Sequence, residues 1–84
     1  MKPNLRLKAA ILEVVETQLN ANEPPETKRT LERLTAEGHS QQQAKELIGT
    51  VVAAEMFYVL KEGKPFNAER FAAALERLPE IPEE

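Results

Sequence analysis

The sequence predicts an all-α fold, a small bundle of about four helices. Apolar residues recur at spacings of three and four along most of the chain, which is the period of an amphipathic helix. Few β-branched residues stand together and no alternation of period two is sustained, so strands are not expected. Two of the three Gly residues, together with Pro residues, separate the predicted helices, which span about 4–21, 24–37, 41–62 and 68–78.

The first two predicted helices differ in the apolar surface that they offer. At about 100° per residue, the helix at 4–21 gathers a wide apolar face. Its members are Leu7, Ile11, Leu12, Val14, Val15 and Leu19. The helix at 24–37 begins at Pro24-Pro25, where proline loses no helical hydrogen bond, and ends before Gly38, which suits a left-handed cap. Its apolar stripe is narrow and consists of Thr27, Leu31 and Leu34.

The third predicted helix, at 41–62, is the longest and is expected to be central. Ser40 followed by Gln43 is a capping box, and Gly63 suits the opposite end. The main apolar face consists of Ala44, Leu47, Ile48, Val51, Val52, Tyr58 and Val59. A second apolar face, which we call the outer stripe, consists of Ala53, Met56, Phe57 and Leu60. A helix with two apolar faces is either the centre of a bundle or half of an interface.

The fourth predicted helix, at 68–78, is short but has a clear start signal. Asn67 is a favourable N-cap residue, and the apolar pair Phe66 and Phe71 has the spacing of a hydrophobic staple. We therefore expect one helical domain over residues 1–78, followed by a frayed Pro/Glu-rich tail at 79–84.

Composition excludes several classes of function. The chain of 84 residues has no Cys and one His, and all 14 acidic residues are Glu, so thiolate, multi-His and Asp-rich metal sites are not expected. The net charge is -3, and charges of both signs alternate without a basic stripe, which argues against nucleic-acid or membrane partners. We expect a cytoplasmic protein without a cofactor, a metal or a catalytic residue.

Glu55 is the most informative polar residue, because it lies near the centre of the main apolar face of the third helix. An unpaired buried carboxylate is costly, so it needs a partner. If the first and third helices run parallel, Gln18 lies level with Glu55, whereas Lys8 lies nearer the opposite end. The sequence therefore predicts a contact between Gln18 and Glu55, a Glu55 pKa raised by burial, and an outward-pointing Lys8.

Two interpretations of Glu55 stay open. It is either a buried polar contact that sets the helix register or, with Gln18, a ligand-binding or acid–base group in a small pocket. The lack of a second catalytic group favours the first interpretation. His39 beside Ser40 is expected to be a surface loop residue, because Ser40 serves as the N-cap.

The basic group Lys28-Arg29 with Arg33 is expected to form a solvated face of the second helix. Such a group is the densest cluster of positive charge in the chain, but Glu26 and Glu32 dilute it. A solvated face is therefore the favoured interpretation, and a partner-binding patch is the alternative.

The outer stripe is the strongest functional signal. Met56, Phe57 and Leu60 suit a helix–helix contact with another chain. The alternative is that the fourth helix, or the tail through Ile81, covers these side chains within one molecule.

Three segments together resemble a known type of protein. These are Val-Val-Glu-Thr-Gln-Leu at 14–19, the following Glu-Pro-Pro-Glu-Thr, and Arg-Leu-Thr-Ala-Glu-Gly at 33–38. The pattern resembles a family of short bacterial all-helical domains of unknown function, over roughly residues 8–60. The resemblance implies a bacterial cytoplasmic origin and a helical fold, and it supplies no activity. Members often carry histidines on the first and third helices, and this chain has none there.

These observations predict a non-catalytic interaction or structural module that self-associates through the third helix as a homodimer, or that binds another protein. The alternative is a small ligand- or metal-binding or catalytic domain centred on Glu55 and Gln18.

Overall fold

The computed structural model of the chain, which describes residues 5–81, confirms the all-α fold. Its four helices are α1 (Leu5–Ala21), α2 (Pro25–Ala36), α3 (Gln41–Glu62) and α4 (Ala68–Arg77). Each predicted helix is present, and the bounds of α3 coincide with the predicted ones. The described residues include no strand. Of the predicted tail, residues 82–84 lie outside the described residues.

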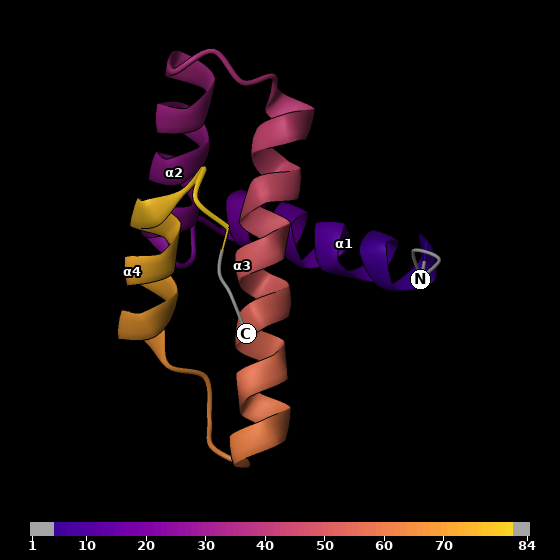
Figure 1. Cartoon of the computed structure of the whole chain (residues 1–84). Helices are drawn as coiled ribbons and strands as arrows, with labels where there is room; N and C mark the ends of the chain where they lie inside the picture. The colour runs from indigo at the N-terminus through magenta and orange to yellow at the C-terminus, as the bar shows by residue number, and fades with distance from the viewer. Residues whose placement is uncertain (1–4, 82–84) are drawn as a thin grey trace.

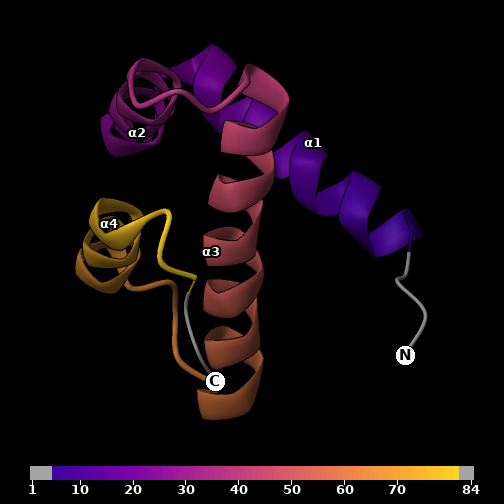
Figure 2. The ribbon, with the colours of Figure 1, turned by 45° about the horizontal axis from the view of Figure 1, so that its top comes forward.

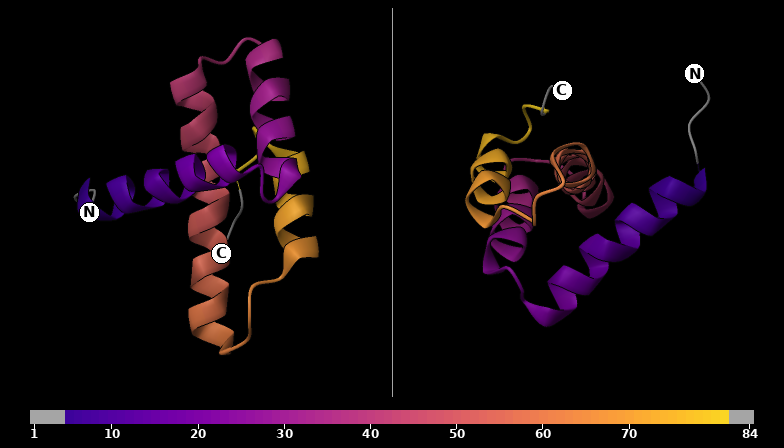
Figure 3. Two further views of the ribbon diagram at one scale, coloured as in Figure 1. Left: turned by 180° about the vertical axis from the view of Figure 1, so that it is seen from behind. Right: turned by 90° about the horizontal axis from the view of Figure 1, so that it is seen from below.

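Helix α3 is central, as predicted: it is the longest helix and contacts each of the other three, although α2 also does so. Helices α2 and α4 lie on one side of α3, one above the other, and both run opposite to it (Figure 1). Helix α1 instead lies across α3 (Figures 1 and 2). The N-terminal half of α1 projects past α3 on the side away from α2 and α4 (Figure 3). The expectation that the first and third helices run parallel is therefore wrong.

The helix ends follow local side-chain chemistry. The Ser40 hydroxyl accepts a hydrogen bond from the Gln43 amide, and the Gln43 side chain accepts one from the Ser40 amide, each at 3.0 Å. Gly63 closes α3 in the left-handed conformation, with φ of 65°. The Asn67 side chain accepts from the Arg70 amide at the start of α4. Phe66 and Phe71 form the predicted staple, with ring centroids 5.4 Å apart.

The end of α1 uses a signal that sequence analysis overlooked. Asn22 has φ of 53°, in the left-handed region that asparagine tolerates better than most residues. This turn lets the Glu23 amide donate to the Gln18 carbonyl at 3.1 Å, which satisfies one of the last free carbonyls of α1. The chain then reverses into α2.

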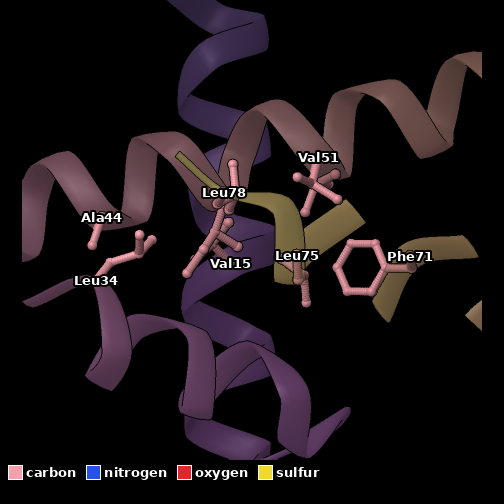
Figure 4. Close-up of a cluster of buried hydrophobic side chains, with 9 residues drawn as sticks. Val15, Leu34, Ala44, Val51, Phe71, Leu75 and Leu78 are labelled. Carbon is pink, nitrogen blue, oxygen red and sulfur yellow. The ribbon is translucent and has the colours of Figure 1, made fainter. Parts of the chain in front are cut away.

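A single core joins all four helices (Figure 4). Its buried members are Val15, Leu34, Ala44, Ile48, Val51, Val52, Phe71, Leu75 and Leu78. Most of them lie on α3 and α4 or, in the case of Leu78, directly after α4. On α1, however, only Val15 is fully buried, while Leu7 is 49% and Val14 39% exposed. These two side chains stay exposed because a helix that crosses α3 buries less of its face than one that lies alongside it.

Helix α1 packs against α3 at Gly49. A Cβ atom at this position would lie 3.2 Å from Cγ2 of Ile11, closer than most contacts between real side chains. The missing side chain therefore leaves room for the Ile11 side chain of α1 against α3. Ion pairs from Lys8 to Glu46 and from Lys45 to Glu16 lie beside this contact.

No helix among residues 5–81 has the length and the apolar character that crossing a membrane requires.

We expect the substitution Gly49→Val to lower the free energy of unfolding by about 2 kcal/mol, because the new side chain overpacks the contact with Ile11. Valine has a higher helix propensity than glycine, so a loss of stability reflects the altered contact with Ile11 and not a change in helix propensity. Urea unfolding followed by circular dichroism measures the change. The matched control is Ala54→Val on the same helix, where the side chain is only partly buried. An unchanged midpoint for Gly49→Val would show that α1 does not depend on this close approach.

Candidate functional site

Glu55 is buried, as predicted, but its partners lie on α4 and in the loop before it. Only 5% of the residue is exposed. Oε1 accepts a hydrogen bond from Nε of Arg70 at 2.9 Å, and Oε2 accepts one from Nη2 of the same side chain at 2.9 Å. The backbone amide of Asn67 also donates to Oε2, at 3.0 Å. Both carboxylate oxygens are therefore occupied by a two-pronged ion pair and a helix-cap amide.

Arg70 is held in turn by two further groups. Its Nη1 donates to Oε1 of Glu62 at 3.3 Å, and its guanidinium carbon lies 4.4 Å from the centroid of the Tyr58 ring. A planar guanidinium can bind a carboxylate along one edge and stack on an aromatic ring with its face, which lysine cannot do. We call Glu55, Glu62, Tyr58 and Arg70 the ionic cluster.

The electrostatics of the ionic cluster contradict one prediction. The hydrogen bonds from Arg70 lower the pKa of Glu55 from its ordinary value, and they outweigh burial, which raises it; the Asn67 amide lowers it further. Contact with Glu55 correspondingly raises the pKa of Arg70. The prediction of a raised Glu55 pKa was wrong, because it considered burial without the cation that accompanies it.

The predicted contact between Gln18 and Glu55 is also wrong. Oε1 of Gln18 accepts a hydrogen bond from the Thr27 hydroxyl at 2.9 Å and so joins α1 to α2. Lys8 is exposed, as predicted, and its Nζ lies 3.0 Å from Oε2 of Glu46. The error about Gln18 follows from the assumption of parallel helices, which set the wrong residues level with each other.

Arg33 is a second residue whose role the sequence concealed. Its Nη1 and Nη2 donate to the carbonyls of Leu78 and Leu75, each at 3.0 Å, and Nη1 also contacts Glu37 at 3.2 Å. These carbonyls are at the C-terminal end of α4, where a positive charge is favourable. Lys28 and Arg29 are exposed as expected, but Arg33 is half-buried and is not part of a solvated face.

The two arginines together fasten α4 at both ends, Arg70 to α3 and Arg33 to α2. The sequence contained a signal for the role of Arg70. This residue precedes Phe71, the first buried residue of α4, and therefore lies beside the contact between α4 and α3. No comparable signal marked Arg33, whose partners are backbone carbonyls far along the chain.

An apolar groove lies between α1, the C-terminal half of α3 and the start of α4. Its volume is about 380 Å³. It is lined by Val14, Gln18, Val52, Glu55, Met56, Val59, Leu60, Phe66 and Phe71. Gln18 and Glu55 thus line one groove although they do not bond to each other, and we call it the α1–α3 groove.

The outer stripe is exposed beside this groove. Met56 is 42%, Phe57 38% and Leu60 82% exposed, so α4 leaves these three side chains open to solvent. Ile81 is itself 55% exposed, and the described part of the tail does not cover them. Met56 and Leu60 line the α1–α3 groove, whereas Phe57 lies outside it, with its ring 5.8 Å from that of Tyr58 and 5.6 Å from Nζ of Lys61.

Other candidate chemistry finds no support in the described residues. Within residues 5–81, no three His, Asp or Glu side chains come together in a way that could hold a metal ion. Ser40 serves as the N-cap of α3, and His39 is half-buried in the preceding loop. The ionic cluster thus joins helices, and a ligand-binding or catalytic role for Glu55 and Gln18 stays a prediction.

Comparison with known proteins identifies no relative, since no family model, curated protein or solved structure matches the chain. The resemblance to short bacterial helical domains therefore stays a prediction.

We expect Glu55→Gln to lower the free energy of unfolding by about 2 kcal/mol at neutral pH, because it leaves Arg70 without its principal partner. The loss is smaller than for a fully buried pair, since the Arg70 side chain is one-third exposed and water can solvate it. The matched control is Glu46→Gln, which removes an exposed carboxylate from the same helix and is expected to have a much smaller effect. Urea unfolding measures both, and equal losses would show that burial adds nothing to the Glu55 pair.

The lowered pKa of Glu55 also predicts how stability depends on pH. A carboxylate whose pKa is lower in the folded state stabilises the fold above its unfolded pKa, near 4.5, and loses this contribution as pH falls toward the folded value. Wild-type protein should therefore lose stability below about pH 4.5, and Glu55→Gln should lose less over the same range. Thermal unfolding between pH 3 and 7 checks this. Parallel curves for the two proteins would contradict the prediction.

Proposed function

We propose that the chain is a non-catalytic interaction module that acts by self-associating through the outer stripe of α3. The observation that carries the proposal is the exposure of Met56, Phe57 and Leu60 next to the α1–α3 groove. Large apolar side chains that are exposed singly are ordinary, but several that adjoin an apolar groove are typical of a binding surface. Methionine and aromatic side chains are also enriched at the centres of protein interfaces.

The charge of the chain bears on the kind of partner that it binds. A net charge of -3 with interspersed signs suits a protein partner better than nucleic acid or an anionic membrane. Together with this function we propose a cytoplasmic location and a bacterial origin for the protein.

Size-exclusion chromatography with light scattering tests it. Wild-type protein at high concentration should have twice the chain mass of 9.4 kDa. Leu60→Glu should raise the dimer dissociation constant at least about tenfold, because it places a carboxylate in an apolar contact. Since Leu60 is 82% exposed in the single chain, this variant should keep its helix content and unfolding midpoint. The matched control, Ala73→Glu on the exposed side of α4, should dimerise as wild type does. A wild-type mass of one chain at high concentration contradicts the proposal.

A further inference from the structure

The projecting half of α1 carries an apolar face of its own. Leu7 and Val14 are seven residues apart, and Ala10 lies between them on the same side of the helix. All three are exposed, and Val14 lines the α1–α3 groove. The face of α1 and the outer stripe of α3 therefore form the two arms of one apolar corner.

The charges at the edges of this corner differ in sign between the two arms. Glu13 flanks the apolar face of α1, and it has no ion-pair partner among the described residues. Lys61 and Lys64 flank the end of the outer stripe, and they also form no ion pair within residues 5–81. Nζ of Lys61 lies 5.6 Å from the centroid of the Phe57 ring.

From these observations we infer that the occupant of the corner is a second copy of the chain, which lays its α1 along the C-terminal half of α3 and receives the first copy's α1 in the same way. This inference rests on the proposed self-association and adds its geometry. Helices α1 and α3 cross each other within one copy (Figures 1 and 3). A twofold axis that bisects the angle between them therefore makes α1 of one copy parallel to α3 of the other, and the reverse. Each copy then buries both arms of its corner.

The edge charges select the direction in which the helices run. If α1 of one copy and α3 of the other run in the same direction, Glu13 of each comes near Lys61, at the end of α3, and Lys64, just beyond that end. If they run in opposite directions, Arg6 comes to this end instead and is repelled by the two lysines.

The test uses two charge-reversal variants of the full chain, Glu13→Lys and the double variant K61E/K64E. In a reciprocal dimer, each variant alone brings like charges together twice, and its dissociation constant should rise about tenfold at low ionic strength. In a mixture of the two variants, both contacts again join opposite charges, so a heterodimer of wild-type affinity should form. Sedimentation velocity measures the affinities, and circular dichroism confirms that the variants are folded.

The controls carry the same changes in charge on α2, far from the corner. They are Glu32→Lys and the double variant K28E/R29E, and both should dimerise as wild type does. Recovery of the dimer only in the mixture supports the inference. The arrangement is overturned if each variant alone dimerises with wild-type affinity. It is also overturned if both variants are weakened and their mixture stays monomeric. In either case the proposed self-association itself would still stand. A monomeric wild-type protein overturns both.

Discussion

The ion pair between Glu55 and Arg70 determines where α4 lies, and the core depends on that position. Helix α4 has ten residues, which is too short to be stable without tertiary contacts. It nevertheless supplies Phe71 and Leu75 to the core, and Leu78 follows at its end. Arg70 aligns the start of α4 with α3 through Glu55, and the same carboxylate accepts from the Asn67 amide at the N-cap. One buried carboxylate thus fixes both the position and the first turn of the helix.

Such a pair is better suited to specifying an arrangement than to adding stability. Removing Glu55 and Arg70 from water has a cost that their attraction only partly offsets, so a well-packed apolar pair could stabilise the fold as much. An apolar pair, however, would allow α4 to shift along α3, whereas the two hydrogen bonds of the guanidinium require one register. Stacking of Arg70 on Tyr58 adds a second geometric condition. In a chain of 84 residues without disulfides, a defined register has particular value.

Local signals in the sequence predicted the helices well, because their causes lie within a few residues. The capping box at Ser40, the N-cap at Asn67 and the left-handed Gly63 each act over one turn. The relative placement of the helices was not predictable in the same way. The crosswise packing of α1 depends on Gly49 and Ile11, which are distant in sequence, and a glycine within an apolar helix does not reveal which neighbour approaches it. The wrong partner for Glu55 followed from that one geometric assumption. The position of the outer stripe could be predicted because it depends only on the wheel of α3, whereas the groove beside it required the position of α1; the role of the stripe as an interface stays a prediction.

The crosswise packing of α1 also explains why so small a chain exposes so much apolar surface. A helix that lies alongside α3 would cover Met56 and Leu60 and bury Leu7 and Val14 in the same contact. Crossing at Gly49 separates these two sets. Met56 and Leu60 therefore stay exposed on α3, at 42% and 82%, and Leu7 and Val14 stay exposed on α1, at 49% and 39%. Because the two sets would suit each other within a parallel pair of helices, they also suit each other between two copies. An arrangement that leaves complementary surfaces apart in one molecule is the physical basis on which a second copy can bring them together.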